Sequence, residues 1–293
     1  MRRRELILAL ASVPLAARAE EPLPVVASFS VLGDMVRQIG GDAVAVRTLV
    51  PADGDAHTYQ PRPSDLLAIR SARVVVLNGL GLDKWTDRLL ASAGGNAARV
   101  TATGAVTARH MSEDGKTIVD PHAWQDPRNG VLYARAIIEG LAKADPSRAS
   151  LFRDRGENFV RSIDETDAWI VSTLAPVPPE KRKIITSHDA FDYFGARYGI
   201  TFHGVEGIST EAEPSAQSLA RLAAQIGREH IRAVFLENMT DPRIARALAR
   251  EADAVVDGTV YSDALSPPGG PADTYLKMFR HNVPLFAAAM AQN

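Results

Sequence analysis

The sequence predicts an α/β protein of two lobes, each a mostly parallel sheet flanked by helices, joined by one long backbone helix. Short runs rich in β-branched residues alternate with amphipathic stretches in both halves of the chain. A strand followed in turn by a helix favours parallel pairing of the strands. A helical pattern much longer than the others lies between the halves. A chain of 293 residues is also long enough for two domains or lobes.

The first half begins with a strand and a helix. Residues 25–29 form a β-branched run, and Ser30 follows as a helix cap. The apolar residues after this cap recur at helical spacing: Val31, Leu32, Met35, Val36 and Ile39. The same reasoning predicts further strands at 44–50, 74–77 and 99–101, with helices starting at Ser64 and spanning 83–90.

The second half repeats this alternation. Its predicted strands are 184–186, 200–205, 233–236 and 254–256, and its predicted helices are 191–198, 215–230 and 242–251.

The long helical pattern opens at Pro146 and runs to about Leu174, where a cluster of prolines ends it. Its large apolar residues recur at steps of seven and four, which places them on one face. At a rise of 1.5 Å per residue the helix would be about 40 Å long, enough to run the height of two lobes. The pattern is equally compatible with an ordinary packed helix. We expect residues 20–145 to form an N-terminal lobe, 146–175 the linking helix and 176–293 a C-terminal lobe.

Residues 1–19 have the pattern of a secretory signal peptide. Three arginines precede an apolar run from Leu6 to about Ala16, and a small-residue cleavage site follows. The run is too short to span a bilayer. Removing residues 1–19 takes away four arginines and one glutamate, so the formal net charge changes from −2 to −5. We therefore expect an exported, soluble, periplasmic protein with no stable membrane insertion and no affinity for nucleic acid.

The chain contains no cysteine. An exported protein without cysteine has neither disulfides nor a lipid-modified cysteine, so we expect no lipid anchor. A metal ion would have to be held by histidine, aspartate or glutamate.

Three of the seven histidines lie where predicted strands pass into loops: His57, His122 and His188. Ligands bind at the carboxyl ends of strands in open parallel sheets, so three such positions across two lobes indicate one shared metal site. The other histidines have ordinary structural interpretations. They lie in a polar loop, within a strand, at a helix end and near the C-terminus: His110, His203, His230 and His281.

A closed tetrahedral site needs a fourth ligand, and carboxylates are the candidates. Asp263 lies in the long loop after the last predicted strand. Its rivals are Glu206, Glu211, Glu213, Glu237 and Asp257. The residues alone do not choose among these acids.

Several short motifs together resemble those of the periplasmic zinc and manganese solute-binding proteins of ABC importers, the cluster A-I or cluster 9 metal receptors, here of zinc type. The resemblance covers the whole mature chain and extends to the Asp263 loop. The motifs are Asp55-Ala56-His57 before a proline-rich helix start, Asp120-Pro121-His122-Ala123-Trp124, Thr186-Ser187-His188-Asp189-Ala190-Phe191 with Tyr193-Phe194, and Glu237-Asn238.

The resemblance implies two α/β lobes joined by a long helix, with metal held between them by His57, His122, His188 and Asp263. It implies a zinc receptor for an ABC transporter and no enzymatic activity. Manganese-binding relatives tend to have glutamate in place of His188, and three imidazoles with one carboxylate suit tetrahedral Zn2+. The partners expected are the ABC permease and a periplasmic metallochaperone, and the receptor is expected to be a monomer.

The chain differs from many zinc receptors in lacking a long histidine-rich loop before His122. We expect residues 111–115 to form a short mobile flap near the site instead. The alternatives are a zinc hydrolase in which Asp263 is a base, although no H-E-x-x-H motif is present, a manganese receptor, and an adhesin or scaffold that binds metal for stability.

Overall fold

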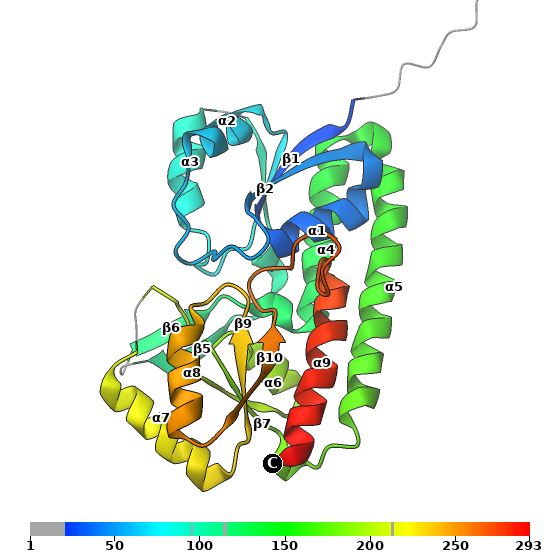
Figure 1. Cartoon of the computed structure of the whole chain (residues 1–293). Coiled ribbons are helices and arrows are strands. Elements are labelled where there is room, and N and C mark those ends of the chain that lie inside the picture. The colour runs from blue at the N-terminus through cyan, green and yellow to red at the C-terminus, as the bar shows by residue number, and fades with distance from the viewer. Residues whose placement is uncertain (1–20, 95, 114–115, 212–213) are drawn as a thin grey trace, which may run out of the picture.

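The computed structural model describes residues 21–94, 96–113, 116–211 and 214–293. The predicted signal peptide, residues 1–19, lies outside the described residues. The architecture confirms the predicted fold class, with two lobes stacked above one another and a long helix running beside both (Figure 1). Within the described part of the chain, no helix is both long and apolar enough to cross a membrane.

The N-terminal lobe is built on a four-stranded parallel sheet in the order β2-β1-β3-β4. The strands are β1 (Leu23–Phe29), β2 (Val44–Val50), β3 (Val74–Leu77) and β4 (Ala98–Thr101). Helices α1 (Ser30–Gly40), α2 (Pro63–Ser71), α3 (Trp85–Ala93) and α4 (Pro127–Ala144) accompany them. The apolar face predicted for α1 is buried.

The C-terminal lobe has a second four-stranded parallel sheet, in the order β10-β9-β7-β8. Its strands are β7 (Lys183–Thr186), β8 (Thr201–Gly204), β9 (Ala233–Glu237) and β10 (Val255–Val260). Its helices are α6 (Asp192–Tyr198), α7 (Ala216–Glu229), α8 (Pro242–Glu251) and α9 (Tyr275–Gln292). His203 lies in β8 and His281 in α9, and His230 caps α7, as predicted.

A two-stranded antiparallel hairpin was not predicted. Strands β5 (Arg109–Glu113) and β6 (Lys116–Asp120) form it, so the prediction of a polar loop at His110 is wrong. Residues 111–113 of the expected flap belong to β5, while 114 and 115 lie outside the described residues, so the flap stays a prediction. The hairpin is held to the C-terminal lobe by an ion pair from Arg109 to Asp192 and by the Tyr193 hydroxyl, which donates to the Asp120 carbonyl at 3.1 Å.

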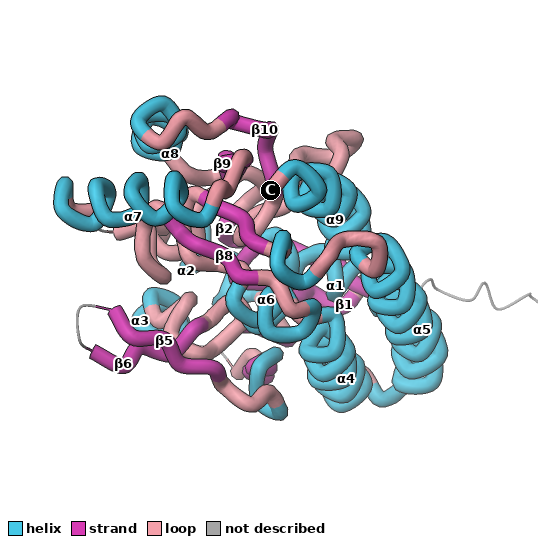
Figure 2. Tube along the Cα trace, turned by 90° about the horizontal axis from the view of Figure 1, so that it is seen from below, coloured by secondary structure: helices cyan, strands magenta, loops and turns pink. Residues whose placement is uncertain are grey.

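The long helix α5 (Ala149–Leu174) follows a short 3₁₀ turn at Pro146–Arg148. The predicted apolar face is buried, and it includes Phe152, Phe159, Ile163, Ile170 and Leu174. These side chains belong to one apolar cluster with Val74 of the N-terminal sheet, Phe235 of the C-terminal sheet and Phe286 of α9. Seen from below, α4, α5 and α9 stand together on one side of the molecule (Figure 2). The helix thus acts as a strut and as a packed core element at once.

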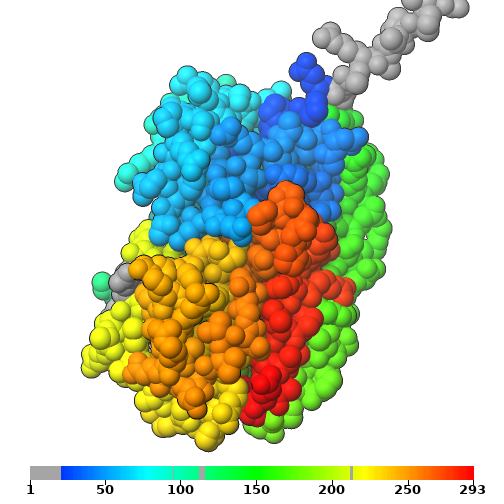
Figure 3. All heavy atoms as spheres, in the orientation of Figure 1, coloured from blue at the N-terminus to red at the C-terminus, as the bar shows by residue number. Residues whose placement is uncertain are grey.

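The loop between β10 and α9 returns from the C-terminal lobe to the N-terminal one (Figure 3). Leu265 is bound from both sides: its N–H donates to the Ser30 hydroxyl at 2.9 Å, and its carbonyl accepts the Asp53 N–H at 3.0 Å. Gly130 lets α4 approach the start of α9, since a Cβ there would lie 2.4 Å from the Tyr275 hydroxyl. The two hydrogen bonds of Leu265 tie the loop that carries Asp263 to the start of α1 and to the loop after β2, which carries His57.

Candidate metal centre

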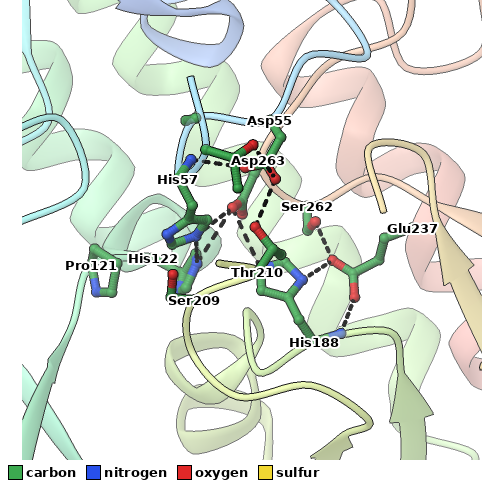
Figure 4. A network of polar contacts seen from close by, with 12 residues as sticks. Asp55, His57, Pro121, His122, His188, Ser209, Thr210, Glu237, Ser262 and Asp263 are labelled. Carbon is green, nitrogen blue, oxygen red and sulfur yellow. Dashed lines mark hydrogen bonds and ion pairs between the residues drawn. The ribbon is translucent and has the colours of Figure 1, made fainter. Parts of the chain in front are cut away.

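Four side chains from both lobes meet between the two sheets (Figure 4). His57, His122, His188 and Asp263 each offer one ligand atom, and these atoms lie within 4.8 Å of one another. His57 lies in the loop after β2, His188 two residues after β7, and Asp263 in the loop after β10. His122 instead follows β6 of the hairpin, so it reaches the site from a strand outside the parallel sheets. The structure therefore brings together all four residues that the resemblance selected.

The three imidazoles direct their Nε2 atoms at one carboxylate. Oδ2 of Asp263 lies 3.0 Å from His57 Nε2, 3.5 Å from His122 Nε2 and 3.4 Å from His188 Nε2. The side chains of His122, His188 and Asp263 are fully buried, and that of His57 is 6% exposed. Apart from these contacts with the imidazoles, neither oxygen of Asp263 has a hydrogen-bond partner among the described residues. A buried carboxylate facing three imidazole nitrogens fits a bound cation.

Two of the histidines are oriented by carboxylates on their far side. Asp120 Oδ1 lies 2.7 Å from His122 Nδ1 and accepts the His122 N–H at 2.9 Å. Glu237 Oε2 lies 2.7 Å from His188 Nδ1, and Glu237 Oε1 accepts the His188 N–H at 2.8 Å. Such partners fix the tautomer and the direction of an imidazole that binds metal. Sequence reasoning weighed Glu237 only as a rival ligand and did not find Asp120 in this role.

The other rival acids lie outside the group of four. Glu206 is largely buried beside the site, Glu211 is exposed, and Asp257 lies in β10. Glu213 lies outside the described residues.

His57 has no equivalent support. Its contacts with His122 and Asp263 both use Nε2, and no carboxylate contacts its Nδ1 among the described residues. Its loop is held instead through Asp55, which accepts the His57 N–H at 2.8 Å and the Thr210 hydroxyl of the other lobe at 2.6 Å. His57 is therefore the least constrained of the four.

The carboxylates set the protonation of the metal-free site. Burial would lower the pKa of His122, but the charges of Asp263 and Asp120 outweigh it and raise this pKa to about 9. For His188, Glu237 and Asp263 likewise outweigh burial and raise the pKa well above its usual value. Burial would raise the pKa of Asp263, yet the two imidazoles hold it well below the usual range. These shifts favour protonated His122 and His188 beside an ionised Asp263 when no metal is bound.

The loops that carry His122 and Asp263 are tied directly to each other. Trp124 Nε1 and Gln125 Nε2 both donate to the carbonyl of Ser262, at 3.0 and 2.9 Å. The Tyr275 hydroxyl donates to the Trp124 carbonyl at 2.6 Å, and the Ser262 hydroxyl donates to Glu237. One hydrogen-bond network therefore positions His122, His188 and Asp263 together.

Residues 25–289 match the model of the ZnuA family, described as zinc-uptake complex component A, periplasmic. The chain belongs to this family. The match spans both lobes and all four site residues, and it confirms the resemblance to metal receptors of ABC importers.

Relatives of this ZnuA family member are named for different metals. This chain is similar to the manganese-binding lipoprotein MntA of Halalkalibacterium halodurans, with 32% identity over 93% of this chain and 90% of that one. It is 26% identical to the metal ABC transporter substrate-binding lipoprotein SloC of Streptococcus mutans, over 94% of this chain and 92% of that one. Its fold matches the periplasmic zinc binding protein TroA of Treponema pallidum with a TM-score of 0.87 and 27% identity, over 92% of this chain and 99% of that one.

The family establishes the broad function of the chain. It is a metal-binding, substrate-binding protein of an ABC transporter, whose partner is the transporter's membrane component, and it is not an enzyme. The hydrolase alternative is thereby set aside.

Proposed function

We propose that this protein is a high-affinity zinc receptor that is exported to the periplasm by residues 1–19 and delivers Zn2+ to an ABC permease for import. The observation that carries the choice of zinc is the donor set, with three imidazole nitrogens and one carboxylate oxygen facing a common point. Zn2+ favours four such ligands in a tetrahedron, with Zn–N distances of about 2.0–2.1 Å. Mn2+ favours more oxygen ligands.

In this proposal His57 and His122 bind from lobe 20–145, and His188 and Asp263 bind from lobe 176–293, with 146–175 as the linking helix. The three buried ligands form the preorganised part of the site. Asp120 and Glu237 orient His122 and His188, and the bonds to the Ser262 carbonyl hold the Asp263 loop. His57 completes the site from its less constrained loop. A monomeric state and a metallochaperone as donor belong to the same proposal.

Metal content tests the assignment directly. Protein purified without a histidine tag is expected to hold one zinc per chain by elemental analysis, and to keep zinc when dialysed against an equal concentration of Mn2+. Retention of manganese in place of zinc would support the manganese receptor instead. Absence of any metal, even after zinc is added, would refute the receptor proposal.

Zinc affinity is expected to rise with pH between about 6 and 8. The pKa of His122 is raised to about 9 and that of His188 is raised well above its usual value, so both rings bind protons more readily than free histidines do. Zinc needs neutral imidazoles, so binding must release these protons, about two per ion, and acid weakens binding.

Titration calorimetry in two buffers of different ionisation enthalpy counts the protons released. An affinity that stays constant over this pH range, with no proton release, would contradict the protonation state described for the empty site.

A further inference from the structure

A large groove opens beside the metal centre, on the side of the molecule away from α5. Its cavity is about 1200 Å³, and α3 and the β5–β6 hairpin lie on either side of it (Figure 1). Its walls come from both lobes and are mainly apolar and aromatic, and they include Tyr59, Leu80, Trp85, Ile118, Val119 and Ile208. A cavity of this size is large for a bare ion and is typical of a site for an organic ligand.

The groove reaches the metal centre through His57. Of the four site residues, His57 alone lines the groove, and it alone has an exposed part of its side chain. An ion that enters from this side therefore meets His57 before the three buried ligands. His57 is also the one histidine of the site whose Nδ1 has no carboxylate partner among the described residues, so it is held less firmly than His122 and His188.

The charged residues of the groove do not suit a bare dication. Lys84 and Arg88 line it, both are exposed, and neither side chain has an ion pair or hydrogen bond among the described residues. Glu211 is the one acid in the described lining. Two free positive charges repel Zn2+ at the point of entry, whereas they attract a zinc complex that carries net negative charge.

The groove wall is coupled to the His57 loop. Trp85 Nε1 donates to the Ala56 carbonyl at 3.1 Å, one residue before His57, and the rings of Trp85 and Tyr59 are 4.9 Å apart. Leu80 is placed in the lining by a turn in which it adopts a positive φ of 52° between Gly79 and Gly81. A ligand in contact with Trp85 therefore lies against the segment that carries the outermost metal ligand.

We propose that this groove binds a small polycarboxylate chelate of the metal, so that the receptor accepts zinc from its anionic complex rather than as a free ion. Lys84 and Arg88 bind the carboxylates, and the apolar wall contacts the carbon skeleton of the chelator. Imidazole nitrogens then replace carboxylate oxygens on the ion one by one, beginning with His57. The protons carried by His122 and His188 pass to solvent as these rings bind the ion, and the free chelator leaves. No electrons are transferred. The inference rests on the proposed function, since it requires the four residues to bind the metal.

The test compares zinc transfer from zinc citrate with transfer from free zinc. Stopped-flow fluorescence of the tryptophans follows loading at a fixed free zinc concentration while the concentration of zinc citrate is raised. In the parent the loading rate is expected to rise with zinc citrate and then to saturate, which indicates a binding step. A rate set by free zinc alone would refute the proposal.

A charge-reversed double variant, K84E/R88E, gives the sharper result. It is expected to accept zinc from citrate about tenfold more slowly and free zinc no more slowly than the parent. The control K143E/R246E makes the same change in net charge at exposed cations outside the groove, and it should behave as the parent does.

Equal slowing in both double variants would assign the effect to net charge and would overturn the proposed groove site. The proposed function fails in a separate way, if the parent binds no zinc at equilibrium from either source.

Discussion

Replacement of His188 by alanine is expected to abolish stoichiometric zinc binding, with a loss of affinity greater than about 100-fold. Loss of a residue that only orients a ligand typically costs about 10 to 100-fold, and removal of a ligand should cost more. His188 is fully buried and its Nε2 lies 3.4 Å from Asp263 Oδ2, so its loss removes one of the three imidazoles of the site. The measurement is zinc content by elemental analysis, followed by competition against a chelator of known affinity.

The control is His203→Ala. His203 also lies in the C-terminal lobe, but in β8 and outside the group of four, so this variant should keep its zinc. Circular dichroism shows whether His188→Ala is folded, and His188→Gln, which keeps most of the side-chain volume, serves as a second variant. Folded variants of His188 that retain one tightly bound zinc would refute its role as a ligand.

Replacement of Asp167 by alanine is expected to destabilise the protein by about 3 kcal/mol without removing a metal ligand. Asp167 is a buried residue of α5 on which three side chains converge. It accepts hydrogen bonds from Arg197 Nε at 2.8 Å, from the Tyr198 hydroxyl at 2.6 Å and from Arg128 Nε at 3.0 Å. Alanine leaves the buried Tyr198 hydroxyl and the largely buried Arg197 without this carboxylate.

This destabilisation should depend on pH. Burial would raise the pKa of Asp167, but the hydrogen bonds from Arg197 and Tyr198 outweigh it and lower this pKa. A lowered pKa stabilises the fold above the unfolded-state value and loses that contribution as the pH falls through the folded-state value. The difference in free energy of unfolding between the parent and Asp167→Ala should therefore become smaller at acid pH.

Urea unfolding of the metal-free proteins at neutral and acid pH measures both effects. Asp164→Ala is the matched control, because Asp164 lies on the same helix and pairs with the same Arg128, but its side chain is about half exposed. The Asp164→Ala replacement should lower the free energy of unfolding by less than about 1 kcal/mol. Equal losses in the two variants would contradict the role given to the buried carboxylate.

Regular elements were predictable because their local signals agree with their place in the fold. The run at Val74–Leu77 is apolar throughout and became a buried central strand with the predicted limits. The hairpin was not predictable in this way, since Arg109–Glu113 is polar and has no strong strand pattern. Part of its fixation comes from Asp192 and Tyr193, more than 80 residues further along the chain.

The site was predictable in part for the same reason. Histidine after a strand is a visible signal, and it found His57, His122 and His188, although the strand before His122 was not predicted. Asp263 was chosen by resemblance, because loop acids look alike in sequence, and the difference between Asp263 and Glu237 arises only in three dimensions. Asp263 faces the Nε2 atoms, whereas Glu237 holds the opposite edge of one ring.

The apolar core shared by the two lobes limits the conformational change that metal binding can cause. Side chains of both sheets, α5 and α9 belong to one continuous cluster, so the lobes cannot swing apart on a hinge without exposing it. The metal-free and metal-bound receptors should then have nearly the same overall conformation. A permease could not distinguish them by that conformation alone. We therefore expect a permease to distinguish the metal-bound receptor by a few surface atoms beside the ion, such as those of the Asp55–Thr210 contact between the lobes.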